Sequence, residues 1–97
     1  MKSKTAYTPK ELVDILIAHE ALIGEFEQIN QGLIEGRDAM YDAGKGEKFD
    51  HYRGHTLKHR LDAAANEFRS RYEANVPKNV RDLLESANIL PDFKFSV

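Results

Sequence analysis

Counted from Leu12, every seventh residue in the first half of the chain is apolar, except for one histidine. The positions are Leu12, His19, Phe26, Leu33 and Met40. Seven residues are close to two turns of an α-helix, so these side chains form one stripe along a single helix. The stripe predicts a helix over residues 9–43. At 1.5 Å per residue it would be about 50 Å long.

The start of this helix has a clear local signal after an N-terminal arm over residues 1–8. Thr8 is suited to the N-cap, Pro9 to the first helical position, and Glu11 to the acid of a capping box. Three glycines weaken the interior of this helix, because each costs about 1 kcal/mol relative to alanine. A kink or break near residues 30–32 is therefore the alternative. These glycines are Gly24, Gly32 and Gly36. The spacing of the last two also permits close packing with another helix.

The segment 44–49 carries two glycines and predicts the turn of a helical hairpin. A second helix is expected over residues 50–75, antiparallel to the first. At 100° per residue its apolar side chains fall within about 80° of arc. They are Leu57, Leu61, Ala64, Phe68 and Tyr72.

A third, short helix is predicted over residues 77–88, where Asn88 is suited to a left-handed stop. Its expected apolar stripe is Val80, Leu83, Leu84 and Ala87. The first helix is apolar on a second side, at Val13 and Ile17, and we expect the third helix to cover these residues. The far half of the first helix would stay thinly covered and is a candidate surface for self-association.

The tail over residues 89–97 alternates polar and apolar side chains, which is typical of an extended segment. We favour the interpretation that Phe93 and Phe95 fold back over the helices. The alternative is a short peptide that adds to a groove or sheet edge of a partner. The sequence therefore predicts a single all-α domain over residues 1–97: a long antiparallel helical hairpin, a short third helix and an extended C-terminal tail.

Composition excludes several classes of site. With 97 residues the chain can bury a modest core but not a deep substrate cavity as well. The absence of cysteine excludes disulfides and thiolate metal sites, and an intracellular, cytoplasmic location is expected because small secreted domains more often carry disulfides. We expect no membrane span and no targeting segment, since the longest apolar run near the start covers only residues 15–18.

The net charge of −2 hides a division along the chain. Residues 9–43 hold eight acids and two bases, a net of −6, whereas residues 44–72 hold seven bases and four acids, a net of +3. We expect the two segments to attract each other within the molecule. The alternative is that the basic segment binds nucleic acid through Arg53, Lys58 and Arg60.

Histidines recur every fourth residue on the second predicted helix, at His51, His55 and His59. We favour a plain solvated face over a metal site. These histidines are also candidates for contact with a partner, and titration near neutral pH would make that contact pH-sensitive. The alternative is a metal site formed by His55, His59 and Asp62, because imidazoles at this spacing can share one ion. His19 lies on the core stripe instead and is expected to be packed and satisfied by one hydrogen bond.

Arg53 and His59, with five residues between them, resemble the arginine-to-histidine motif of the all-helical HEPN ribonucleases. Gly54 departs from that pattern, because it replaces the polar residue that usually follows the arginine. The resemblance implies an enzyme in which this pair attacks RNA.

The function we predict is non-catalytic binding to another protein, as an adaptor, assembly factor or inhibitor, with a homodimer formed through coiled-coil-like contacts as a further form. We expect no cofactor and no catalytic residues. The predicted contact surfaces are the hairpin tip, the histidine stripe and the tail. Their residues are Met40, Tyr41, Phe49 and Tyr52 at the tip, His51, His55 and His59 on the stripe, and Phe93 and Phe95 in the tail.

Overall fold

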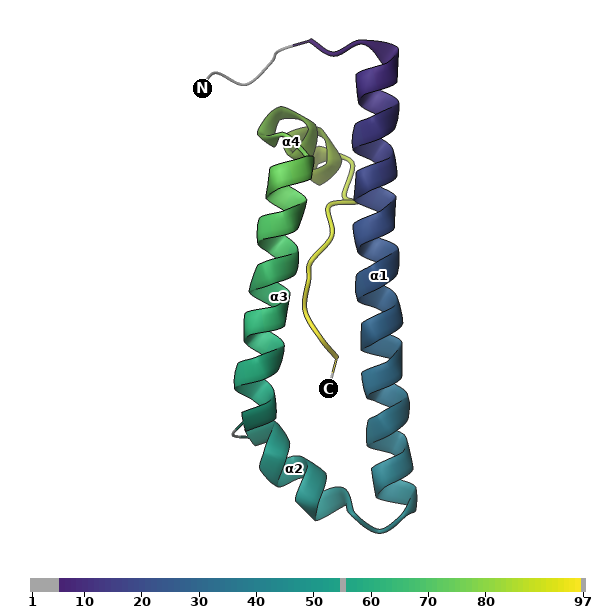
Figure 1. Ribbon diagram of the computed structural model, residues 1–97, viewed down its shortest axis with the longest axis vertical. Helices are drawn as coiled ribbons and strands as arrows, with labels where there is room; N and C mark the ends of the chain where they lie inside the picture. Colours follow the sequence, from purple (N-terminus) through teal and green to yellow (C-terminus); the bar gives the residue numbers. More distant parts are fainter. Residues whose placement is uncertain (1–5, 55, 97) are drawn as a thin grey trace.

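The computed structural model describes residues 6–54 and 56–96, which form an elongated helical hairpin of 55 × 22 × 19 Å (Figure 1). Four helices and no strands occur within these ranges. The helices are α1 (Pro9–Asp42), α2 (Gly46–Gly54), α3 (Thr56–Asn75) and α4 (Lys78–Ser86). The predicted all-α hairpin with a short final helix and an extended tail is confirmed. None of these helices is both long enough and apolar enough to cross a bilayer.

Helix α1 begins where the local signal predicts. The Thr8 hydroxyl accepts a hydrogen bond from the Glu11 amide, and the Glu11 carboxylate accepts one from the Thr8 amide, each at 3.2 Å. The helix then runs unbroken for 34 residues through Gly32 and Gly36, so the kinked alternative is wrong. It ends at Asp42, and Gly44 reverses the chain with a φ of 74°.

The second arm of the hairpin differs from the single helix expected over residues 50–75. Helix α2 already begins at Gly46 and ends at Gly54, and α3 starts anew at Thr56. Gly54, the last residue of α2, has low helix propensity and suits the end of a helix. Helix α2 is inclined to α3 and approaches the C-terminal end of α1 (Figure 1). Phe49 of α2 is buried, with 6% of its surface exposed.

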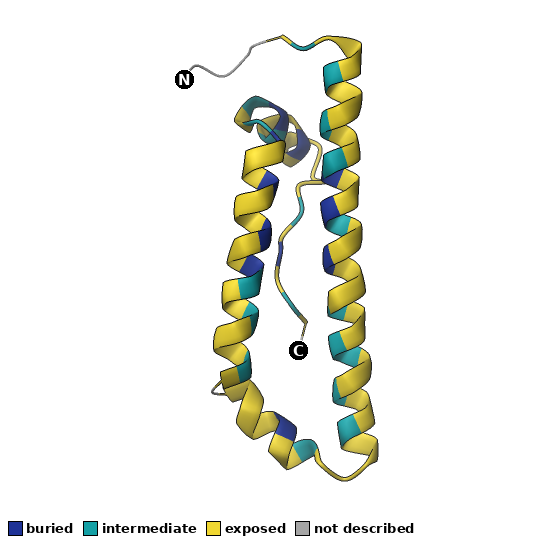
Figure 2. Ribbon diagram, in the orientation of Figure 1, coloured by how far each residue is buried: buried dark blue, intermediate teal, exposed yellow. Residues whose placement is uncertain are grey.

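The core lies at the end of the hairpin away from α2 (Figure 2). It joins α1, α3, α4 and the tail, with the following buried side chains: Leu22, Phe26, Phe68, Tyr72, Val76, Val80, Leu84 and Phe93. The tail runs extended between α1 and α3 (Figure 1). Phe93 is only 3% exposed, and Phe95 stacks on Phe26 with 4.4 Å between ring centroids. The interpretation in which the tail folds back is therefore confirmed.

Helix α4 buries only part of its predicted stripe. Val80 and Leu84 are in the core, but Leu83 is 70% exposed. Ala87 is exposed as well and follows the last residue of α4, so the placement of these two residues on the buried face is wrong. Asn88 has the left-handed φ of 61° that a helix stop requires, as predicted. The expected cover of α1 by this helix is also wrong, because Val13 and Ile17 remain 54% and 59% exposed. Helix α4 packs at the α1–α3 seam, and these two residues face away from it.

Candidate functional site

A groove of about 650 Å³ opens at the α2 end of the hairpin, and we call it the hairpin groove. It lies between the C-terminal part of α1, helix α2 and the first turns of α3. Its apolar lining consists of Leu33, Met40, Phe49, Tyr52 and Leu57. Three of the four residues predicted for the hairpin tip are therefore brought together: Phe49 is buried at the base, Met40 is half-buried, and Tyr52 is 47% exposed.

Two glycines widen the groove on its α1 side. Gly32 and Gly36 both line it and lie one helical turn apart. A Cβ atom added to either would meet nothing within 4 Å, so neither glycine is needed for packing inside the chain. Each costs helix stability without an internal contact in return. Their effect on this surface is to leave the α1 backbone open to an approaching molecule.

Tyr41, the fourth tip residue, lies outside the lining of this groove and holds α1 to α2. Its hydroxyl donates a 2.5 Å hydrogen bond to Oδ1 of Asp50, and its ring contacts Phe49 with centroids 6.0 Å apart. The hydrogen bond to the Asp50 carboxylate is the main reason why the pKa of Tyr41 is raised. The ring also packs so closely on Gly46 that any Cβ there would clash with it. Tyr41 thus has a structural role at the tip.

The rim of the groove is positively charged. Arg37 and Arg60 line it, and no carboxylate does. Arg37 contacts Asp38 at 3.2 Å and donates to the Ser96 carbonyl at 3.3 Å. Arg60 makes no ion pair with any carboxylate of the described ranges. A ligand with acidic groups would therefore meet an uncompensated guanidinium at this edge.

The histidine stripe extends over two helices in the structure. His51 lies on α2 and His59 on α3, because the helix ends between them, and His55 lies outside the described residues. Within the described part of the chain, no three His, Cys, Asp or Glu side chains are grouped closely enough to hold a metal ion. Asp62, the proposed third ligand, lines a different pocket, beside the tail.

The basic residues suggested for nucleic-acid binding face two directions. Arg60 lines the hairpin groove, whereas Arg53 and Lys58 line the pocket beside the tail. The structure therefore does not gather them into one patch. Arg53 and His59, the pair that resembles a ribonuclease motif, lie on α2 and α3 respectively, and of the two only Arg53 lines that pocket.

Phe93 and Phe95 were candidates for partner contact through the tail. The ring of Phe93 packs against Phe26, Phe68 and Tyr72 with centroid distances of 5.2, 5.9 and 5.4 Å. Its interactions are thus made inside the chain. Phe95 is half-buried against Phe26.

Sequence reasoning missed the α3 wall of the hairpin groove, formed by Leu57 and Arg60. The sequence pattern places Leu57 on the buried face and makes Arg60 a candidate for a nucleic-acid surface. Only the packing of α3 against α1 places both beside Gly32 and Gly36. The available signal was the pair of glycines in a helix whose apolar side had little cover.

Comparison with known proteins gives no relative, since no protein-family model, no curated protein and no solved structure matches the chain.

Proposed function

We propose that this protein is a non-catalytic binding module that holds an amphipathic, acid-bearing helix of another protein in the hairpin groove. The observation that carries the proposal is the open apolar lining between α1, α2 and α3, with a glycine pair on one wall and arginines on its rim. Apolar surface of this kind is costly to leave in water and is typical of recognition sites.

The shape of the groove favours a helix as the ligand. Helix-binding grooves accept apolar side chains spaced three or four residues apart along one face. Leu33, Met40 and Leu57 offer the matching apolar contacts. The side chain of Tyr52 adds a half-exposed aromatic ring, the residue type that most often dominates the binding energy of an interface. Gly32 and Gly36 let the backbone of the bound helix come close to that of α1.

Charge favours an acid-bearing partner. Arg37 and Arg60 both line the groove. Arg37 already contacts Asp38, whereas Arg60 pairs with no carboxylate of the described ranges and is the guanidinium left for a ligand. Asp or Glu residues flanking the apolar face of the partner would pair with this guanidinium group, which binds carboxylates in a bidentate fashion. A basic partner would be repelled, so charge supplies specificity as well as attraction.

The test uses two designed helical peptides with the same leucine face, one flanked by glutamates and the other by lysines. Binding is measured by fluorescence anisotropy with the wild-type protein, with the double variant Gly32→Ala/Gly36→Ala and with Gly24→Ala. We expect the acidic peptide alone to bind, and the double variant to weaken it at least about tenfold, because two methyl groups narrow the groove. Gly24→Ala is the matched control, since Gly24 does not line the groove and its added Cβ also meets nothing within 4 Å.

Equal binding of the two peptides, or unchanged binding by the double variant, would contradict the proposal. Sedimentation equilibrium of the pure protein decides whether the occupant is a second copy. A dimer that is lost in Gly32→Ala/Gly36→Ala and retained in Gly24→Ala would assign the groove to self-association and overturn the proposal of a different protein as partner.

A further inference from the structure

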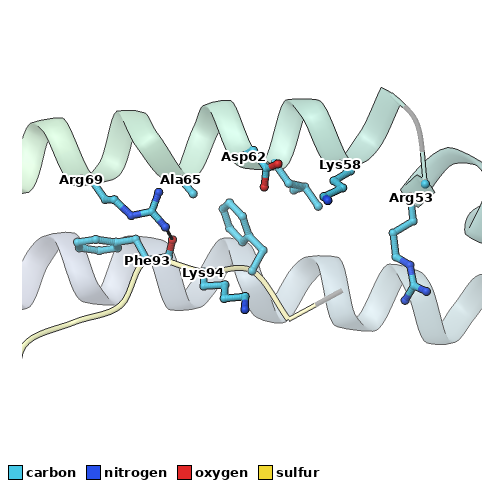
Figure 3. Close-up of a pocket in the computed structure, with 10 residues that line it drawn as sticks. Arg53, Lys58, Asp62, Ala65, Arg69, Phe93 and Lys94 are labelled. Atoms are coloured by element: carbon cyan, nitrogen blue, oxygen red, sulfur yellow. Dashed lines mark hydrogen bonds between the residues drawn. The ribbon is translucent and has the colours of Figure 1, made fainter.

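A second pocket lies between α3 and the tail, and we call it the seam pocket (Figure 3). Its volume is about 370 Å³, and it shares no lining residue with the hairpin groove. Its apolar walls come from two segments that are distant in sequence. Leu61 and Ala65 belong to α3, and Phe93 and Phe95 belong to the tail. The pocket therefore exists only while the tail is docked on the hairpin.

Positive charge gathers around this pocket. Its lining contains four basic residues and one acid, a net charge of +3; the bases are Arg53, Lys58, Arg69 and Lys94, and the acid is Asp62. In a chain whose overall charge is −2, this concentration is local. Stabilisation of the fold does not explain all of this positive charge, because the four basic residues differ in what they contact.

Arg69 has an internal role. Its guanidinium donates to the Phe93 carbonyl at 2.8 Å and so fixes the tail to α3 (Figure 3). It also donates to Oδ1 of Asn66 at 2.6 Å. Lys58 and Lys94 have no such role. Neither makes an ion pair with a carboxylate in residues 6–54 or 56–96, although one is on α3 and the other on the tail. Two ammonium groups that pair with no carboxylate of the described ranges thus line one apolar pocket, one from α3 and one from the tail.

We infer that the seam pocket binds a small amphipathic organic anion, with an aromatic or aliphatic body and a carboxylate or phosphate head group. The body would lie against Leu61 and Phe95, and the head group would be held by Lys58 and Lys94. A volume of about 370 Å³ falls within the usual range for small-molecule pockets, which combine apolar walls with a few polar groups that orient the ligand. This inference goes beyond the proposed function and does not depend on it.

Binding in this pocket would also act on the fold. A ligand that touches both α3 and the tail binds only the docked form of the tail, so it stabilises that form by mass action. We therefore expect the ligand to raise the thermal unfolding midpoint and to protect the backbone amides of residues 92–96 from hydrogen exchange.

The experiment measures binding of 1-naphthyl phosphate and 1-naphthoate by isothermal titration calorimetry, beside inorganic phosphate and neutral 1-naphthol. We expect both naphthyl anions to bind, and inorganic phosphate and 1-naphthol to bind at least about tenfold more weakly. Inorganic phosphate lacks the aromatic body, and 1-naphthol lacks the anionic head group. The double variant Lys58→Gln/Lys94→Gln should bind the anions at least about tenfold more weakly. The control Lys10→Gln/Lys48→Gln removes the same charge from exposed positions that do not line the pocket, and should retain wild-type affinity.

Both double variants change exposed side chains, and circular dichroism checks that each folds like the wild type. Three results would overturn the inference. They are failure of the wild type to bind either naphthyl anion at 1 mM, an equal loss of affinity in the two double variants, and equal affinity for inorganic phosphate and 1-naphthyl phosphate. The peptide assay for the hairpin groove is unaffected by any of these results, so the two proposals fail separately.

Discussion

At the scale of single residues, the most informative contact is the polar pair formed by His19 and Tyr72 inside an apolar core. His19 is 8% exposed and Tyr72 is 3% exposed, and Nδ1 of His19 shares a 2.5 Å hydrogen bond with the Tyr72 hydroxyl. Each side chain satisfies a polar atom that would otherwise be buried without a partner. Because the two residues come from α1 and α3, the bond also favours one register of the hairpin.

Replacing Tyr72 with Phe tests the weight of this pair. The substitution keeps the ring but leaves Nδ1 of His19 without its partner, so we expect a loss of about 1–3 kcal/mol in the free energy of unfolding. Urea denaturation followed by circular dichroism gives the value. Tyr52→Phe is the control, since that hydroxyl belongs to a half-exposed residue and its loss should change stability by less than about 0.5 kcal/mol. Equal effects of the two substitutions would contradict a stabilising role for the buried bond.

Burial also makes the stability of the hairpin sensitive to alkaline pH. Desolvation raises the pKa of Tyr72 above its ordinary value of 10.0, and the charge of Arg81 offsets part of this effect. The phenol therefore loses its proton more readily in the unfolded chain. The stabilisation of the fold that comes from the protonated Tyr72 phenol is fully present below about pH 10. It is lost as the pH rises through the folded-state pKa of Tyr72. Measured from pH 8 to pH 11.5, the unfolding free energy of the wild type should fall more steeply above pH 10 than that of Tyr72→Phe.

At the scale of elements, α1 depends on its N-terminal cap. Its first turn carries Glu11, which suits the helix dipole, but its last turn has no basic residue. The reciprocal hydrogen bonds between Thr8 and Glu11 are thus a main local interaction that stabilises one end of this 34-residue helix.

Thr8→Ala should therefore lower the free energy of unfolding by about 0.5–2 kcal/mol, because the amide of Glu11 loses its acceptor. Amide hydrogen exchange should rise first in residues 10–12. Ser70→Ala provides the comparison: Ser70 is exposed within α3, and alanine has the higher helix propensity, so this variant should be as stable as the wild type or slightly more stable. A Thr8→Ala variant with unchanged stability would show that the cap contributes nothing measurable.

The elements that sequence patterns predicted well are those with a local cause. The start of α1 follows from Thr8 and Glu11, and the end of the α4 region from the left-handed Asn88. The end of α2 at Gly54 had a local signal too, but glycine also occurs at Gly32 and Gly36, where α1 is continuous. Propensity alone does not decide between these outcomes. The bend after α2 lets Phe49 reach α1, a contact that appears only once the hairpin has closed.

At the scale of the whole molecule, the tail completes the core that two helices leave open. Figure 2 shows buried positions where α1, α3, α4 and the tail meet, while much of the outer surface of α1 stays exposed. Phe93 is the centre of this closure, with aromatic neighbours from both arms of the hairpin. A chain of this size has a small core, so one large side chain contributes a large part of the buried apolar surface.

Phe93→Ala should consequently cost about 3–5 kcal/mol, the usual range for removing a buried phenylalanine ring. Thermal unfolding measures the loss, and the same variant should lose the ligand of the seam pocket because that wall is gone. Leu83→Ala is the matched control: it also shortens an apolar side chain, but Leu83 is 70% exposed, and its effect should stay within about 0.5 kcal/mol. If both substitutions cost the same, the tail is not part of the stabilising core.

Charge contributes less to the closed hairpin than the division of acids and bases predicted. Across α1 and α3, Arg71 and Glu25 form the single ion pair seen in the described ranges, at 3.2 Å and with both side chains about half exposed. Such a pair is worth about 0–1 kcal/mol. The acidic and basic segments still favour antiparallel pairing at longer range. The close contacts between the arms are chiefly aromatic and aliphatic.

The amino-acid sequence by itself determined the helical class, the hairpin, the start of α1 and the extended form of the tail. These features follow from periodicity and from hydrogen bonds between residues a few positions apart. Tertiary structure alone decided that Leu83, Val13 and Ile17 stay exposed, and that Leu57 and Arg60 face Gly32 and Gly36 across a groove. The physical reason is that an apolar stripe identifies a face able to be buried, whereas burial also needs a distant segment whose position depends on how the remaining chain packs.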